Sequence, residues 1–292
     1  MFKDNPTLRN GIIVGAVGVV VLLVIATTVL VRTSPLNRTY SVSVQTVPIP
    51  TDAESLARGE YLVRAVGACM VCHGDDLSGR LAFEDAFLGE VYTPNLTTGE
   101  GGVGQTYTTE DWVRSIRHGI GPDGKGLIFM PVDSYYHLTD EDLGAMIAFL
   151  QSVPPVDNTN AARRLTLPAQ ILLTLGASGQ VARTELIPHE APRPSAPEDP
   201  GEYLTDIGGC HFCHGPELAG GQGLEPGAPP GSDLTVGGVL DDYTLDDFRL
   251  AMRSGIKLDG TIIDPIYMPW AGYTHMTDED VTAIWDYLRS LD

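Results

Sequence analysis

The cysteines of this 292-residue chain are confined to two short stretches, GACMVCHGDD at 67–76 and GGCHFCHGPE at 208–217. Each stretch has two cysteines separated by two residues, and a histidine follows the second cysteine both times. Two C-x-x-C elements alone are compatible with zinc binding, a redox dithiol, disulfides or haem attachment. The histidine distinguishes these possibilities, because C-x-x-C-H is the pattern of c-type haem attachment. The spacing therefore predicts two covalently attached haem c groups.

Each motif would supply three of the bonds that hold a haem. The two cysteines would form thioethers with the haem vinyl groups, and the adjacent histidine would ligate the iron. Covalent attachment suits a small helical domain, because such a domain cannot enclose the whole macrocycle. We assign haem attachment to Cys69, Cys72, Cys210 and Cys213, and proximal iron ligation to His73 and His214.

The second axial ligand has two kinds of candidate that repeat in both halves of the chain. Met130 follows the first motif, Met268 follows the second at a similar separation, and each methionine precedes a proline. The proline would stiffen the loop that holds a weak thioether near the iron. His137 and His275, each seven residues beyond the methionine, would instead give bis-histidine ligation and lower potentials. We favour the methionines, because the histidines directly precede a helix cap.

The other methionines and histidines lack this repeated context. A methionine often fills a gap in a hydrophobic core, and a histidine without a counterpart in the other half is expected to be solvated. These residues are Met70, Met146, Met252 and Met276, and His118, His189 and His211.

The two motifs belong to a longer internal duplication. The C-x-x-C-H elements begin at Cys69 and Cys210, and YTTEDWVRSIRHGI at 107–120 matches YTLDDFRLAMRSGI at 243–256 at an offset of 136. The Met-Pro pair and a Thr-Asp-Glu-Asp sequence both recur at an offset of 138. Because the features come in the same order in both halves, the sequence indicates a duplicated domain.

Each half has the pattern of a helical domain. Thr108 and Thr244 precede an aspartate by three residues, as helix N-caps do, and apolar residues follow at helical spacing. Thr139 and Thr277 begin the last helix of each half in the same way. No strand pattern competes over any length. The sequence therefore predicts a mainly α-helical protein with two tandem domains.

The first part of the chain predicts a membrane anchor. Residues 11–31 carry no charge, and at about 1.5 Å per residue they reach roughly 31 Å, enough to cross the core of a bilayer. This run is longer than the apolar part of a cleaved signal peptide and has no small-x-small ending. We expect a retained single-span anchor within 1–32 and an extended, proline-containing tether at 33–50.

The remaining boundaries follow from the duplication and the prolines. We assign the first helical domain to 51–153, a linker to 154–198 and the second domain to 199–292. The linker begins and ends with proline-rich sequence. Its apolar segment LTLPAQILLTLGA, at 165–177, is too short to cross a membrane. We expect it to form a helix that packs on a haem domain, on the membrane or on a partner subunit.

The charge of the chain restricts its partners. The net charge is −20, and residues 1–38 carry +3, so the rest of the chain carries −23. Such a surface repels nucleic acid and anionic headgroups, and it attracts basic proteins over distances that salt shortens. The charge also serves solubility, which is the simpler interpretation.

Two segments of the chain resemble the cytochrome c subunits of membrane-bound alcohol, aldehyde and gluconate dehydrogenases. They are residues 91–156, which begin VYTPNLTTGEGG, and residues 267–291, YMPWAGYTHMTDEDVTAIWDYLRSL. The resemblance implies two class I cytochrome c domains with Met130 and Met268 as ligands. It also implies that Pro94-Asn95-Leu96-Thr97 wraps the first haem near its propionates, where the second half has Ser232-Asp233-Leu234-Thr235. Those subunits carry three haem motifs, whereas this chain has two and an apolar N-terminal segment.

Two irons with both axial positions filled leave no open position for a substrate. The sequence therefore predicts an electron-transfer protein rather than an enzyme: a membrane-anchored dihaem cytochrome that passes single electrons between a membrane respiratory or photosynthetic complex, or a dehydrogenase, and another redox protein. Residues 11–31 would contact the lipid bilayer of the cytoplasmic membrane, with both domains on the periplasmic side. The expected partners are subunits of a membrane complex or a basic soluble carrier. The alternative is a dihaem peroxidase-like enzyme, which needs one accessible axial position.

Overall fold

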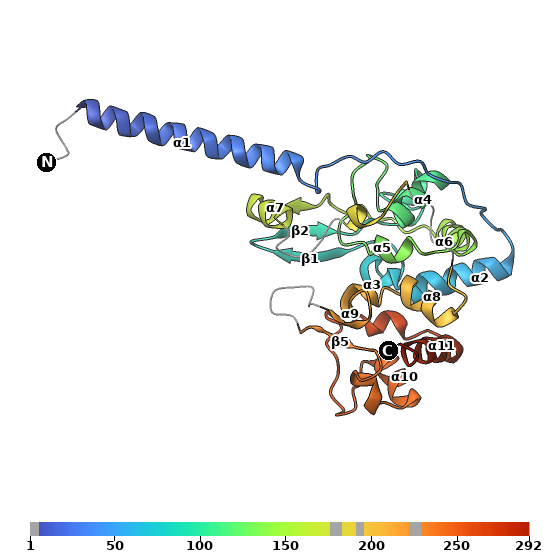
Figure 1. Cartoon of the computed structure of the whole chain (residues 1–292). Helices are drawn as coiled ribbons and strands as arrows, with labels where there is room; N and C mark the ends of the chain where they lie inside the picture. The colour runs from blue at the N-terminus through green and yellow to red at the C-terminus, as the bar shows by residue number, and fades with distance from the viewer. Residues whose placement is uncertain (1–5, 176–182, 191–195, 222–228, 292) are drawn as a thin grey trace.

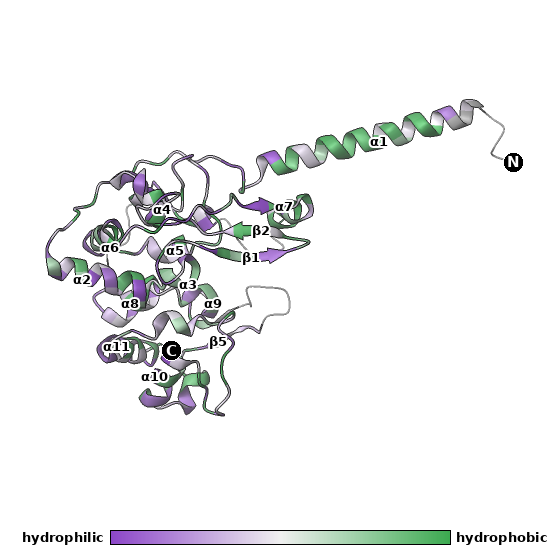
Figure 2. Cartoon of the chain, turned by 180° about the vertical axis from the view of Figure 1, so that it is seen from behind, coloured by the Kyte–Doolittle hydropathy of each residue, from purple (hydrophilic) through white to green (hydrophobic). Residues whose placement is uncertain are grey.

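The computed structural model of the protein describes residues 6–175, 183–190, 196–221 and 229–291. Helix α1 (Pro6–Thr33) projects from a globular part that holds all the other elements (Figure 1). Its apolar side chains are exposed along its length, and Figure 2 shows them as a nearly continuous hydrophobic stretch. Within the described residues, the segment Asn10–Thr33 of this helix is the one that is long and apolar enough to cross a membrane.

Both halves of the globular part are mainly helical, as the sequence predicts. Thr108 and Thr244 form capping boxes with the aspartates three residues on, which confirms these two predicted helix starts. The first half contains α2 (Ala53–Tyr61), the π-helical turn η1 (Leu62–Val66), α3 (Cys69–His73), η2 (Val103–Gln105), α4 (Thr109–His118), α5 (Val132–Tyr135) and α6 (Asp140–Ser152). The second half contains α8 (Pro200–Ile207), α9 (His211–His214), η4 (Val239–Asp242), α10 (Leu245–Ser254), η5 (Trp270–Tyr273) and α11 (Asp278–Leu288).

Short strands accompany the helices. The prediction that neither half contains a strand pattern was therefore wrong. The first half holds an antiparallel sheet in the order β1 (Leu81–Asp85), β2 (Gly89–Tyr92) and β3 (Arg164–Leu165). The second half holds the pair β4 (Ala219–Gly221) and β5 (Gly231–Asp233). The strands are too short to give a clear alternation in the sequence, and β2 pairs with β3 from the linker, far along the chain.

The same helix crossing builds the core of each half. Helix α2 packs against α6, and α8 packs against α11. A glycine makes each crossing close, because a Cβ on Gly59 would lie 2.0 Å from the carbonyl oxygen of Ala145, and a Cβ on Gly201 would lie 2.1 Å from that of Ala283. The buried side chains of both halves form one continuous cluster. The two domains therefore share a core rather than being joined only by the linker.

The segments outside the duplicated parts lie on the first half. The residues predicted as a tether run without regular structure along it, with Leu36 and Val47 buried and the Tyr40 amide donating to the carbonyl of Gly124 at 2.7 Å. The linker contributes α7 (Leu167–Thr174) and η3 (Arg183–Leu186), and α7 contacts α1. The apolar segment at 165–177 is thus helical over most of its length, and its last two residues lie outside the described residues.

Candidate functional site

The two halves pack on each other through reciprocal contacts. The hydroxyl of Tyr61 donates to Asp280 and accepts from the amide of Thr277 at 3.1 Å. In return, the hydroxyl of Tyr203 donates to Asp142 at 2.8 Å and accepts from the amide of Thr139 at 3.2 Å. Each tyrosine reaches the cap of the last helix of the other half. Each half therefore makes on the other the same contacts that it receives. Such reciprocal contacts relate the duplicated domains by an approximate two-fold axis.

Both C-x-x-C-H motifs lie at this interface. A Cβ on Gly272, four residues beyond Met268, would lie 2.5 Å from the Cβ of Ala68, which precedes Cys69. At the equivalent place, a Cβ on Gly209, which precedes Cys210, would lie 3.5 Å from the side-chain oxygen of Ser134. Each motif therefore touches the segment that follows the predicted methionine ligand of the other half.

The motif histidines are oriented by backbone carbonyls. The Nδ1 atom of His73 lies 3.0 Å from the carbonyl oxygen of Pro94, and Nδ1 of His214 lies 2.7 Å from that of Ser232. A carbonyl oxygen can only accept, so Nδ1 carries the proton and Nε2 keeps its lone pair. Burial lowers the pKa of both imidazoles, which keeps them neutral. This orientation is the one that a metal-ligating histidine commonly has.

The stretch that starts at Pro94 acts here through its main chain. Ser232 replaces Pro94 in the second half without loss of the contact, because the acceptor is a backbone oxygen. The amide group of Asn95 is buried and donates to the carbonyl of Val156 at 2.8 Å, which ties the stretch to the start of the linker. Its placement near haem propionates stays a prediction from the resemblance.

A pair of tyrosines that the sequence analysis missed connects each predicted methionine loop to its motif. The hydroxyl of Tyr135 donates to the carbonyl of Gly67 at 2.6 Å, and the hydroxyl of Tyr273 donates to that of Gly208 at 2.9 Å. Each tyrosine comes five residues after Met130 or Met268 and is separated from its counterpart by the same offset of 138. That offset is the signal that would have identified them.

The predicted methionine ligands pack against the same core as the first cysteine of each motif. Met130 and Met268 are half-buried and pack against the shared core, as Cys69 and Cys210 do. In the second half, Sγ of Cys213 is 4.0 Å from the carbonyl oxygen of the residue before Met268. The structure thus brings motif and methionine loop together in each half, and iron ligation by the methionines stays a prediction.

The donor set fits covalent haem better than the alternatives. All four cysteines are unpaired, and burial raises the pKa of Cys69 and of Cys210 to about 12, so these thiols are neutral. Over the described part of the chain, no group of three or more His, Cys, Asp or Glu side chains is placed to hold a metal ion. The buried indole N–H of Trp112 has no acceptor among the described residues. Such an orphaned donor fits a bound group with acceptor atoms.

The histidines considered as alternative iron ligands, His137 and His275, have other surroundings. His137 lies 3.6 Å from a carboxylate oxygen of Asp206 in the other half, and His275 is exposed. His118 contradicts the expectation that it is solvated, because it is buried and its Nδ1 lies 3.1 Å from Nδ1 of His189 in the linker. The reason is that the linker folds back over α4, which the sequence pattern of the duplicated domains does not reveal.

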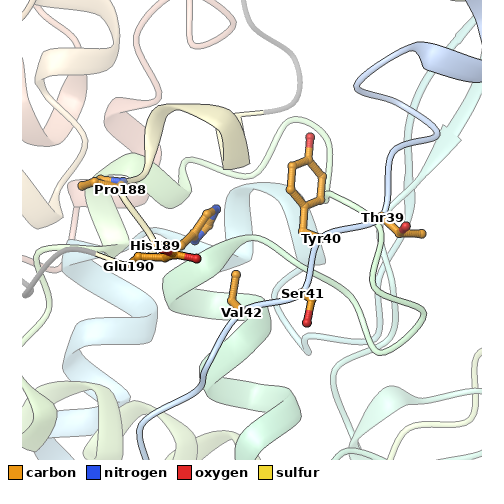
Figure 3. A pocket seen from close by; sticks show the side chains of 7 residues that line it. All are labelled: Thr39, Tyr40, Ser41, Val42, Pro188, His189 and Glu190. Carbon is orange, nitrogen blue, oxygen red and sulfur yellow. The ribbon is translucent and has the colours of Figure 1, made fainter.

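A separate shallow pocket lies where the tether meets the linker. Figure 3 shows Tyr40 and His189 on its two sides, and the hydroxyl of Tyr40 donates to Glu185 at 3.0 Å. Burial and the nearby Glu185 carboxylate raise the pKa of Tyr40 to about 12. None of the residues lining this pocket is a predicted haem residue, so it is not the candidate redox site.

Comparison with known proteins identifies the relatives of the chain. Residues 54–150 match the family described as "Cytochrome C oxidase, cbb3-type, subunit III". The chain is 30% identical over 272 residues to the fructose dehydrogenase cytochrome subunit of Gluconobacter japonicus, covering 84% of this chain and 55% of that protein. It is 30% identical over 268 residues to the gluconate 2-dehydrogenase cytochrome c subunit of Pantoea cypripedii, covering 80% and 59%.

A third relative is closer in length. The chain is 27% identical over 282 residues to a protein of Cereibacter sphaeroides described as "Diheme cytochrome c-type", covering 84% of this chain and 90% of that protein. By contrast, the chain spans a little over half the length of the two dehydrogenase subunits.

Proposed function

The chain contains a cytochrome c domain and is homologous to cytochrome c subunits of dehydrogenases, and from this premise we propose that it is a membrane-anchored dihaem electron carrier. The relatives support electron transfer by a c-type cytochrome. The proposal adds that both motifs carry haem, that both irons have methionine as second ligand, and that α1 holds the protein to a membrane.

The observation that carries the proposal is the repetition of one site geometry. In each half, a carbonyl holds the motif histidine with Nε2 free, and a tyrosine ties the methionine loop to the motif. Haem c attached there would supply a reversible one-electron couple at its iron. His73 and Met130 would hold one iron and His214 and Met268 the other, and the hydrogen bonds to the histidines would tune the potentials. Equal sites in both halves favour a carrier over an enzyme with one open iron.

The shared interface suits transfer between the two halves. The residue before the first cysteine of each motif contacts the other half, through Ala68 on Gly272 and Gly209 beside Ser134. An electron could therefore pass between the two sites through a rigid protein contact, without a domain motion. The reciprocal tyrosine contacts to Asp280 and Asp142 hold that contact in place.

The anchor and the charge suggest the partners. We propose that α1 spans the cytoplasmic membrane and that the globular part lies on the periplasmic side, where c-type haem is attached. A dehydrogenase is the proposed donor, because the relatives are cytochrome subunits of fructose and gluconate dehydrogenases. The −23 charge of the chain beyond residue 38 would steer a basic redox partner to it.

An optical redox titration of the purified full-length protein, with and without carbon monoxide, tests the proposal after the haem content per chain has been measured. Two haems per chain that titrate at positive potentials, unchanged by the gas, would support it. A single haem per chain would refute the dihaem state. A low-potential haem that binds carbon monoxide would show an open axial position, and the peroxidase-like alternative would then replace the carrier.

A further inference from the structure

Helix α7 of the linker is fixed against the end of α1. The hydroxyl of Thr174 donates to the hydroxyl of Ser34, the residue after α1, at 2.7 Å. Leu173 of α7 and Leu36 form a small buried cluster beside it. These contacts place α7 at the point where α1 joins the globular part. If α1 crosses a membrane, α7 therefore lies at the level where α1 leaves the bilayer.

The side of α7 that faces away from the protein is apolar. Ala169 and Leu173 point into the protein and are buried. In contrast, Leu167, Leu172 and Leu175 have 51%, 38% and 66% of their surface exposed. A short amphipathic helix of a water-exposed surface usually carries polar residues on its outer side. The exposed leucines of α7 depart from that rule and call for a partner.

The turn between β1 and β2 extends the apolar surface. Thr166, the N-cap of α7, donates its hydroxyl to the carbonyl of Phe87, and its amide donates to the carbonyl of Leu88 at 3.2 Å. Phe87 is 51% exposed. Figures 1 and 2 show α7 and this turn together at the edge of the globular part on the side toward which α1 projects. The four exposed residues Phe87, Leu167, Leu172 and Leu175 thus form one surface, the α7 patch.

Charged side chains of both signs lie around the α7 patch. Arg32 is exposed in the last turn of α1, and the side chain of Arg164 on β3 is 75% exposed, with Glu90 as its ion-pair partner at 3.8 Å. Arginines beside an apolar surface are favourable at the level of lipid headgroups. The β1–β2 turn also carries the exposed carboxylates of Glu84 and Asp85, so the apolar residues and the position beside α1, rather than the charge, favour a bilayer.

We propose that the α7 patch inserts into the headgroup region of the same bilayer that α1 spans. The lipid bilayer is the occupant that the structure favours, because α7 contacts α1 and the patch lies on the side of the globular part toward which α1 projects. The inference rests on the proposed membrane anchoring by α1. Contact at two places, the span and the patch, would fix how the two redox sites are oriented relative to the membrane, which a single flexible tether would not do.

The test uses the haem-loaded full-length protein in phosphatidylcholine vesicles. Single cysteines introduced as Leu172→Cys and Phe87→Cys carry a bimane fluorophore, and fluorescence is compared in vesicles with and without doxyl-labelled phosphatidylcholine. Val20→Cys in α1 is the control for the span. Leu250→Cys is the matched control for an exposed leucine, on α10 of the second half. Haem absorbance verifies that each variant is folded.

The outcomes separate the inference from the proposed function. The expected result is quenching at 172 and 87 by a doxyl group near the headgroup, quenching at 20 by a doxyl group deep in the acyl chain, and no quenching at 250. Quenching at 20 alone would overturn the α7 patch as a lipid contact while the anchor stands, and would point to a partner subunit on this surface. No quenching at 20 would overturn the anchoring itself.

A second measurement needs no substitution and guards against misfolded variants. The unmodified protein is photolabelled in vesicles that contain a phosphatidylcholine with a diazirine in its acyl chain, and the labelled peptides are identified by mass spectrometry. We expect label in the α7 and β1–β2 peptides as well as in α1. Label in α1 alone would contradict the proposal.

Discussion

The two halves of the globular part have the same site geometry, but the tether packs on the last helix of the first half, whereas the linker contacts both halves. On α6, a Cβ on Gly144 would lie 2.0 Å from the carbonyl oxygen of Pro48, because the tether packs directly on the helix. The equivalent residue of α11 is Thr282, whose hydroxyl donates to the carbonyl of Asp278 in its own helix and accepts from Arg249 of α10. The difference shows that the tether on the last helix is not required for the site geometry, because the second half has the same geometry without a tether at that position.

At the interface, the two halves carry different residues at equivalent positions, and a larger residue in one half is matched by a smaller one in the other. Ala68 in the first half faces Gly272 in the second, whereas Gly209 in the second half faces Ser134 in the first. A larger residue on one side therefore meets a glycine on the other at both places. This comparison indicates that close approach of the motif to the other half is maintained, although the residues that permit it are exchanged.

The largest expected effect comes from removing one methionine at a time. Met130→Ala and Met268→Ala should each open the axial position of one iron and lower its potential by on the order of 0.1–0.3 V, because methionine ligation raises the potential. Redox titration with carbon monoxide would then assign each potential to one half. The unaltered half is the internal control, and a variant with both potentials unchanged would show that the methionine is not the ligand.

The next largest effect should come from exchanging a residue of the interface. Gly272→Ser introduces the side chain that the first half has at this position, but it meets Ala68 and should cost about 1–3 kcal/mol of unfolding free energy by overpacking. Adding Ala68→Gly should recover much of that loss, because the pair then matches Gly209 and Ser134. Denaturant unfolding of the single and double variants measures the coupling. Equal losses in both would refute the compensated contact.

The positive charge of Arg183 offers a finer comparison of the two predicted haem sites. Arg183 of η3 forms an ion pair with Asp133, near the first methionine loop, and its guanidinium lies 4.0 Å from the ring centroid of Phe212, inside the second motif. Arg183→Gln should lower the potential of the second haem by on the order of tens of millivolts, because a nearby positive charge stabilises the reduced state.

Asp133→Asn is the control of opposite sign. It leaves Arg183 without its carboxylate partner and should raise the same potential. Redox titrations of both variants, read against the assignments from the methionine variants, give the two shifts. Shifts of the same sign would show that the ion pair does not act through its charge.

The smallest effect should appear in the dependence of stability on pH. Burial and the neighbouring His189 lower the pKa of His118 to about 4, from an ordinary value near 6.5. The unfolded chain then binds the proton more readily, so the contribution of this pair to stability is complete above about pH 6.5 and is lost as the pH falls toward 4. Denaturant unfolding between pH 7 and 4 should be less pH-dependent in His118→Gln.

His211 of the second half provides the contrasting case. Its hydrogen bond to Asp206, 2.9 Å long, raises the pKa of this imidazole. Its contribution to stability is therefore complete below the unfolded pKa and is lost as the pH rises through the raised value. His211→Gln should flatten the pH profile on the alkaline side, whereas His118→Gln should flatten it on the acidic side. The same slope in both variants would contradict the two opposite shifts.

Much of the fold was predictable because its signals are local. The caps Thr108 and Thr244 need only an aspartate three residues on, and the duplication is visible as a nearly constant offset. The hairpin of β1 and β2 is too short to show a clear alternation, and β3 joins it from far along the chain, so the sequence did not predict this sheet. His118 was misjudged for a similar reason, since the linker residue that covers it lies 71 residues away.

The sequence alone is enough to predict the chemistry of each half. Cys69, Cys72 and His73, and their counterparts in the second half, are close together in the chain, so their spacing predicts haem attachment without reference to the rest of the fold. Local patterns also determined the helical elements and the apolar length of α1.

The tertiary structure alone decided how the two halves meet. Tyr61 and Asp280 are 219 residues apart, and neither residue type nor spacing predicts that they bond across an approximate two-fold axis. The placement of α7 at the base of α1 depends in the same way on Thr174 and Ser34, 140 residues apart. Such contacts follow from shape complementarity between surfaces that form only after each half has folded, and a local sequence pattern does not contain that information.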